Sequence, residues 1–156
     1  MTWNEVISDP SLHDLPYKIE LNREGNIVMS PASNNHAIRQ GRIAGLIVRQ
    51  MTSGEMLVEA SIDTDDSTKV ADVVWMSDAF YKAHEDTTPF PICPELCVEV
   101  VSPSNSRAEM ALKRKLYFAQ GAKEVWFSKQ DGSILFYNPE GELTQSQLFP
   151  DFPKSV

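Results

Sequence analysis

The stretch that decides the fold is PELCVEVVSPSNSRAEMALKRKLYFAQGAKEVW, residues 94 to 126. It begins with a short apolar strand that carries a single carboxylate, Glu99. The residues of this strand alternate between two faces, with Leu96, Val98 and Val100 on one and Cys97, Glu99 and Val101 on the other. Burying an unpaired carboxylate costs several kcal/mol. Glu99 therefore needs a cation, a hydrogen-bonding partner or a water-filled cleft.

A capped helix is predicted after this strand. Ser106 and Glu109 have the Ser-x-x-Glu spacing of a capping box, and Gly121 is placed to end the helix. Pro103 fixes the turn between strand and helix. At 100° per residue, the predicted core stripe of the helix consists of Ala108, Leu112, Leu116 and Ala119.

Two lysines of this helix are candidates to approach Glu99. Lys113 precedes Tyr117 by one turn and lies on the flank of the predicted stripe. Lys115 falls among the apolar residues, where its stem can be buried while its ammonium reaches a polar cleft. The helical wheel alone favours Lys115.

A second strand with one carboxylate is predicted upstream, in KVADVVWM at residues 69 to 76. Asp72 shares a face of this strand with Val70 and Val74. Two carboxylates on largely apolar strands suit a hard divalent cation, because Mg²⁺ takes oxygen ligands and commonly uses one or two carboxylates. Taken singly, each acid is equally well explained as a strand-end residue that faces solvent or pairs with a lysine or arginine.

The rest of the chain predicts a mixed α/β domain. The expected elements are a short helix or two turns in residues 1–15, a hairpin of strands 17–22 and 26–29, a long helix over 33–51, a strand over 54–62, an acidic turn at 63–68, a proline-rich connector at 84–94, and a closing meander of strands 134–137 and 143–148. His36 lies at the start of the long helix and is either a phosphate ligand or a surface histidine.

Composition is typical of one folded domain over residues 1–156. The net charge of −8 argues against a protein held on nucleic acid by bulk electrostatics.

No apolar run could cross a bilayer and the N-terminal MTWNEVISDP has no signal-like segment, so a cytoplasmic location is expected. Cys93 and Cys97 are expected to be reduced, because they lie too far apart along one strand for a disulfide. With His84 they form no complete zinc site.

Several motifs, in their order along the chain, resemble those of the Uma-two-type family of restriction endonucleases, which belongs to the PD-(D/E)XK nuclease superfamily. They are VADVVW at 70–75, EVVSPS at 99–104, Lys113 with Tyr117, and GAKEVW at 121–126. Upstream, the resemblance includes YKIEL at 17–21, GNIVMSP at 25–31 and His36, and downstream it reaches FPDFP at 149–153. The resemblance implies a restriction-endonuclease-like mixed β-sheet with flanking helices.

The resemblance also implies a site. Asp72 and Glu99 stand at the two acid positions, and these two side chains with the carbonyl of Val100 would bind Mg²⁺ or Mn²⁺. Lys113 stands at the position of the site lysine, with Lys115 in reserve, and Glu20 matches an additional upstream acid. Val101 replaces the lysine that the superfamily usually has two residues after the second acid, and the resemblance implies that a helix lysine serves instead in this family. The sequence departs from the pattern in two places: Ala71 replaces the proline of the superfamily motif, and Ser128-Lys129 follow Trp126 where many relatives carry an aspartate.

The function implied is a magnesium-dependent deoxyribonuclease that hydrolyses the phosphodiester bonds of DNA. Cutting both strands would favour a homodimer with two-fold symmetry. The main alternative is a catalytically inactive nuclease-like domain that binds or regulates a partner, because the chain is acidic and Val101 stands in the lysine position. A third possibility is a metal-dependent hydrolase that acts on another phosphate compound.

Overall fold

The computed structural model describes all residues from 1 to 156. Its elements, in chain order, are α1 (Trp3–Ser8), η1 (Pro10–Leu12), β1 (Tyr17–Leu21), β2 (Ile27–Pro31), α2 (Asn34–Gln50), β3 (Glu55–Thr64), β4 (Ser67–Met76), α3 (Asp78–His84), β5 (Leu96–Val100), α4 (Arg107–Ala119), β6 (Glu124–Ser128), β7 (Ile134–Asn138) and β8 (Gly141–Leu143). The hairpin, the long helix and both acid-bearing strands thus form where the sequence predicts them.

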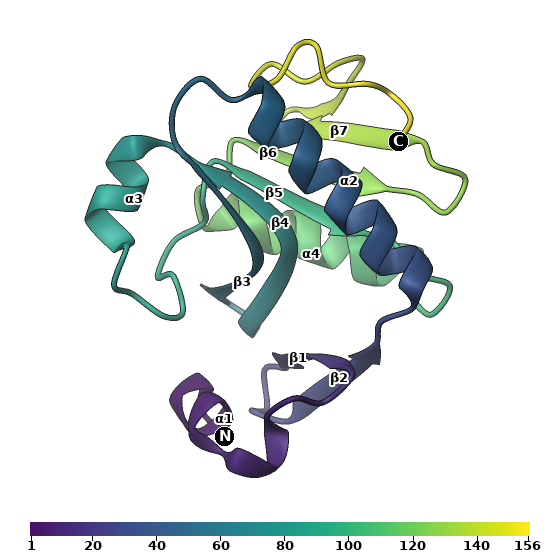
Figure 1. Cartoon of the computed structure of the whole chain (residues 1–156). Helices are drawn as coiled ribbons and strands as arrows, with labels where there is room; N and C mark the ends of the chain where they lie inside the picture. Colours follow the sequence, from purple (N-terminus) through teal and green to yellow (C-terminus); the bar gives the residue numbers. More distant parts are fainter.

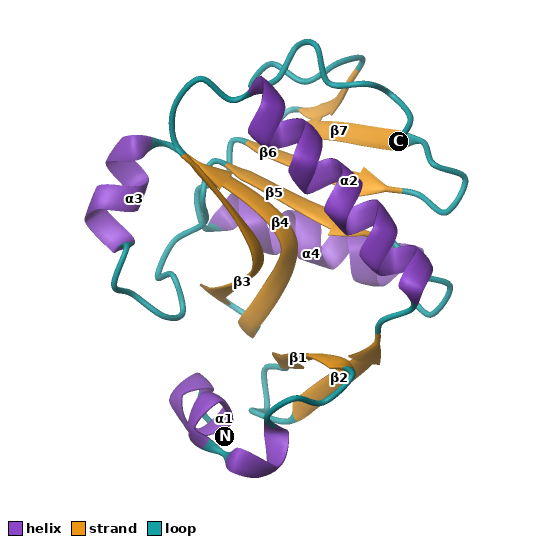
Figure 2. Cartoon of the chain, in the orientation of Figure 1, coloured by secondary structure: helices purple, strands orange, loops and turns teal.

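A mixed six-stranded sheet is the centre of the fold, with strand order β3-β4-β5-β6-β7-β8. Only β5 and β6 pair in parallel, and the other neighbours are antiparallel. The parallel pair requires a crossover connection, which is helix α4. Helices α2 and α4 cover opposite faces of the sheet (Figure 1; Figure 2).

The two faces of β5 pack into two different hydrophobic clusters. Leu96, Val98 and Val100 join the cluster that includes Ile43 and Ile47 of α2. Cys97 belongs to the other cluster, which contains Tyr117 of α4. The alternation predicted for this strand is confirmed, and it directs Glu99 toward the α4 side of the sheet.

The core stripe predicted for α4 is correct at Leu116 and wrong at its other three residues. Leu112 is 44% exposed, and Ala108 and Ala119 are also exposed. The buried residues of this helix are instead Lys113, Leu116 and Tyr117. Lys113 and Tyr117 can face the sheet because Glu99 accepts hydrogen bonds from both of them there. The pattern of apolar residues therefore predicted the wrong inward face for this helix.

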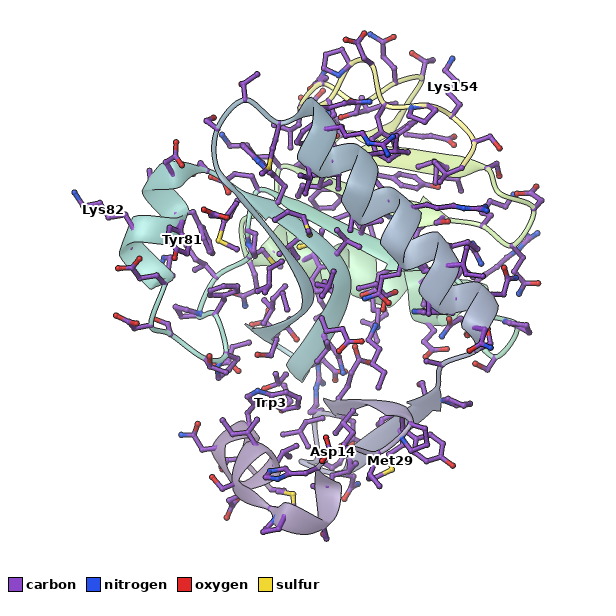
Figure 3. The ribbon with its side chains drawn as sticks, viewed as in Figure 1. Trp3, Asp14, Met29, Tyr81, Lys82 and Lys154 are labelled. Atoms are coloured by element: carbon purple, nitrogen blue, oxygen red, sulfur yellow. The ribbon has the colours of Figure 1, made fainter.

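The β1–β2 hairpin forms a two-stranded sheet of its own that docks on β4. The Nζ of Lys69 donates to the carbonyl of Leu21 at 2.9 Å, and the backbone N–H of Val70 donates to Glu20 Oε1 at 2.8 Å. Figure 1 shows the hairpin and α1 at one end of the main sheet, and Figure 3 shows side chains filling the space between them. Alternation along β1 places Lys18 and Glu20 on one face of the hairpin.

The closing strand differs from the prediction. Only Gly141–Leu143 forms strand β8, and residues 144–148 leave the sheet. This segment is held by the buried carboxylate of Glu124, which accepts hydrogen bonds from the backbone N–H groups of Gln147 and Leu148 at 2.7 and 3.0 Å. Backbone N–H groups that bond to a side chain need no strand partner.

Candidate active site

A small pocket lies where the hairpin meets the main sheet and the first turns of α2 and α4. Three carboxylates and two ammonium groups form ion pairs in it, those of Glu20, Asp72, Glu99, Lys18 and Lys113, and a fourth carboxylate, Glu109, also lines it. Its volume is about 30 Å³, which is enough for water-sized or ion-sized occupants only. We call it the carboxylate pocket.

Glu99 is the central acid of the pocket. Its Oε1 accepts a hydrogen bond from the hydroxyl of Tyr117 at 2.6 Å and lies 3.3 Å from Nζ of Lys113. Its Oε2 lies 3.2 Å from Nζ of Lys18. Burial raises the pKa of Glu99 above its ordinary value, and the two lysines only partly offset this effect because Asp72 and Glu20 are close.

Asp72 is bound at both carboxylate oxygens. Oδ1 lies 3.0 Å from Nζ of Lys18 and 3.4 Å from Nε2 of His36, while Oδ2 accepts from the backbone N–H of Val100 at 2.7 Å. Burial acts to raise the pKa of Asp72, but Lys18, His36 and the Val100 N–H outweigh it and hold the pKa well below its usual value. Asp72 is therefore an anion at neutral pH.

Glu20 links the hairpin to α4. Its Oε1 accepts from Nζ of Lys113 at 2.8 Å and from the backbone N–H of Val70. Burial acts to raise its pKa, but Lys113 and Lys18 lower it below the ordinary value. Glu20 thus holds Lys113 against Glu99 from the opposite side.

The sequence of this chain matches a known family. A family model described as "Putative restriction endonuclease" (Uma2) matches residues 9–155. The chain belongs to the Uma2 family.

A solved structure of similar shape is described as a "putative nuclease belonging to DUF820" from Anabaena variabilis. The two chains superpose with a TM-score of 0.74 at 17% identity, over 99% of this chain and 94% of that chain. At this identity the likeness shows the fold, and it confirms the predicted α/β restriction-endonuclease-like architecture. No curated protein matches the sequence.

No lysine stands two residues after Glu99, and a lysine of α4 lies beside this acid instead. Val101, two residues after Glu99, packs against the hydrophobic cluster on the α4 side. Lys113 brings its ammonium to Glu99 from the helix instead. Lys115 is exposed and lies outside the carboxylate pocket, so the preference of the helical wheel for Lys115 is wrong.

Lys18 is the pocket residue that sequence reasoning missed. Its Nζ lies between the two main acids, 3.0 Å from Asp72 Oδ1 and 3.2 Å from Glu99 Oε2. Burial acts to lower the pKa of Lys18, but the charges of Glu99, Asp72 and Glu20 raise it above its ordinary value. The signal was present in β1, because Lys18 and Glu20 are two residues apart and must share a face.

Of the other residues that the sequence singled out, one lies in the carboxylate pocket and the rest have structural surroundings. The sequence left the place of His36 open, and the structure puts it in the pocket beside Asp72. Cys93 and Cys97 are buried free thiols. The ring of His84 packs against the ring of Phe80, with 4.6 Å between the ring centroids. Ser128, named above as a departure from the family resemblance, is buried and accepts a hydrogen bond from Arg39 at 3.0 Å. Ser128 therefore has a structural partner in this chain.

The donor set of the pocket fits a divalent cation. No group of three His, Cys, Asp or Glu side chains converges on one point in this structure. Mg²⁺ nevertheless commonly takes one or two carboxylates and completes its shell with water and substrate phosphate. Asp72 and Glu99 already share one cation, the Lys18 ammonium, so their oxygens face a common position. No helix is long and apolar enough to cross a membrane.

Proposed function

We propose that this Uma2 chain is a metal-dependent DNA endonuclease whose site is the carboxylate pocket. The observation that carries the proposal is the pair of buried acids on neighbouring strands, Asp72 and Glu99, which share one cation position. The lysine of α4 supports it, because Lys113 contacts Glu99 as well as Glu20. Membership of a restriction-endonuclease family supplies the class of reaction.

Asp72, Glu99 and the carbonyl of Val100 would hold Mg²⁺ or Mn²⁺. When bound, such an ion lowers the pKa of a water molecule and stabilises the charge that develops on a phosphate. The Val100 N–H and His36 fix the carboxylate of Asp72, and the Tyr117 hydroxyl fixes that of Glu99. These contacts hold both carboxylates in fixed orientations, so the backbone need not move to position them.

Lys113 would stabilise the developing charge or orient the attacking water. Its ammonium is held between Glu20 and Glu99, so it is positioned before substrate arrives. Lys18 has a different relation to the metal: its ammonium lies at the shared cation position and must move aside when a metal binds. The hairpin that carries Lys18 is a separate small sheet, so this movement need not disturb the main sheet.

Lys18 also favours the second candidate function, a catalytically inactive nuclease-like domain. Together with Lys113, it already offsets most of the charge of the three carboxylates. If the ammonium of Lys18 stays between the two acids, no metal can bind there, the fold is retained, and the protein acts through binding alone.

If the protein is an active endonuclease, a two-fold dimer would bring two pockets to the two DNA strands.

The test is Mn²⁺-dependent cleavage of supercoiled and single-stranded DNA by wild type and by Asp72→Asn. The matched control is Asp86→Asn, which removes the same charge at an exposed position. We expect cleavage by wild type and by the control, and its loss in folded Asp72→Asn. Equal cleavage by all three proteins, or cleavage by none of them, would contradict the endonuclease and favour the binding domain.

The two helix lysines provide a second matched pair in the same assay. Lys113→Met should lower the cleavage rate by about 10²- to 10³-fold, the usual effect of removing one preorganised charge-stabilising donor. Lys115→Met removes the same charge from the exposed side of α4 and should leave the rate unchanged. A larger loss in Lys115→Met than in Lys113→Met would overturn the assignment of Lys113.

A further inference from the structure

A second concavity adjoins the carboxylate pocket along the other side of the first turn of α4. Its volume is about 400 Å³, and it is lined by Val101, Asn105, Ser106, Arg107, Met110, Ala111, Arg114, Phe127, Lys129, Leu135 and Tyr137. Asn105 lines both cavities, so they are neighbours with one shared wall. We call this second cavity the cationic groove.

The floor of the cationic groove is apolar and aromatic. Val101, Met110 and Leu135 are partly buried against the core of the α4 side and expose the remainder of their surface. The guanidinium of Arg114 lies over the ring of Tyr137, 4.1 Å from its centroid. A guanidinium held on an aromatic ring forms a flat, positively charged platform of the kind on which nucleobases stack.

The rim of the groove is cationic in a protein whose net charge is −8. Arg107, Arg114 and Lys129 come from α4 and the turn after β6, and none of them has a carboxylate within ion-pair distance. Arg107 and Lys129 are exposed, so both can reach a ligand. Cations without internal partners beside an apolar floor match a ligand with both a flat apolar face and negative charge.

We propose that the cationic groove binds an unpaired nucleotide of the DNA strand that enters the carboxylate pocket. The base lies against the Arg114–Tyr137 platform, and the adjoining phosphates face Arg107 and Lys129. This inference rests on the proposed endonuclease function and adds to it a preference for single-stranded or unstacked DNA. Bases inside a duplex are already stacked and cannot enter the groove.

Size supports this division of roles between the two cavities. The carboxylate pocket, at about 30 Å³, admits water or an ion but no nucleoside. The groove, at about 400 Å³, has room for a base and its sugar. A strand whose phosphate reaches Asp72 and Glu99 must place its neighbouring nucleotide outside the pocket, and the groove across Asn105 offers a surface of suitable chemistry.

The test is the affinity for a fluorescent single-stranded oligonucleotide, measured by anisotropy in EDTA so that no cleavage occurs. Arg114→Gln and Tyr137→Leu each remove part of the platform and should weaken binding by about 5- to 100-fold, as expected for loss of one stacked base. The control is Lys82→Gln, which removes a charge on α3 that points away from the body of the protein (Figure 3). Its affinity should stay within twofold of wild type.

A double variant, Arg107→Gln with Lys129→Gln, guards against loss of folding because both side chains are exposed. It should weaken binding of the single strand more than binding of a blunt duplex. Unchanged affinity in the double variant and in folded Arg114→Gln would overturn the groove even if wild type cleaves DNA. Loss of binding in these variants, with no cleavage by wild type, would uphold the groove and contradict the endonuclease.

Discussion

A metal bound in the carboxylate pocket, as proposed, would have to displace the ammonium of Lys18. An ammonium between two buried carboxylates satisfies the same charge that a divalent cation would satisfy, so the two compete for one position. The competition is internal to the chain and therefore independent of protein concentration. The affinity for metal should be limited by the cost of moving Lys18 out.

Lys18→Met should tighten the binding of Mn²⁺ by at least about tenfold, because three carboxylates would then face one ammonium, that of Lys113. The metal-free variant should be less stable than wild type by about 3 to 5 kcal/mol, as is usual when one partner of a buried ion pair is removed. Free Mn²⁺ measured by electron paramagnetic resonance gives the affinity, and urea unfolding in EDTA gives the stability. Lys82→Met is the control, and equal Mn²⁺ affinity in all three proteins would show that Lys18 does not occupy the cation position.

The sequence was sufficient for some residues of the site and insufficient for others. Asp72 and Glu99 were predictable because a carboxylate inside an apolar alternating strand requires a partner. Lys113 came from the family resemblance, since its own helix pattern favoured Lys115. Lys18 could not be predicted as a partner of Asp72, because that contact joins residues 54 positions apart and depends on how the hairpin docks.

Elements were predictable where their signals are local. The capping box of α4 is present, with Ser106 Oγ accepting from the Glu109 N–H at 3.1 Å. The inward face of the same helix was not predictable, because Glu99 on β5 turns two polar-tipped side chains toward the core. The segment after β8 was also missed, because its partner is a side chain from β6.

Glu124 shows how one buried carboxylate can replace a strand pairing. Its oxygens accept hydrogen bonds from Trp126 Nε1, Ser146 Oγ and the N–H groups of Gln147 and Leu148, all between 2.7 and 3.0 Å. Glu124 is 1% exposed, so water cannot compensate for these bonds when they are lost. The C-terminal segment therefore depends on this side chain.

Glu124→Gln should lower the free energy of unfolding by about 2 to 4 kcal/mol, because the amide presents a donor to groups that are themselves donors. Urea unfolding monitored by the fluorescence of the buried Trp126 would measure the change. Glu142→Gln makes the same substitution at an exposed position of β8 and should change stability by less than about 0.5 kcal/mol. A loss below about 1 kcal/mol in Glu124→Gln would mean that residues 146–148 are held by other contacts.

At the scale of the whole molecule, an acidic protein must bind DNA through a local surface. The net charge of −8 repels a polyanion at a distance, so the proposed binding depends on local cations, among them the three of the cationic groove. The family resemblance predicted the substrate class from sequence, but this distribution of charge could not be predicted, because Arg107 and Lys129 are brought together only by the packing of α4 on the sheet.

The salt dependence of binding measures how many phosphates the protein contacts. For single-stranded DNA the slope of log K against log salt concentration is about −0.7 for each phosphate neutralised, so the two cations that face phosphates, Arg107 and Lys129, predict a slope of about −1.4. Anisotropy titrations in EDTA across a range of NaCl concentrations would give this slope. The variant with Arg107→Gln and Lys129→Gln removes both phosphate contacts and should have a slope near zero. A wild-type slope steeper than about −5 would require a broad basic surface elsewhere, and equal slopes in both proteins would place the phosphates outside the groove.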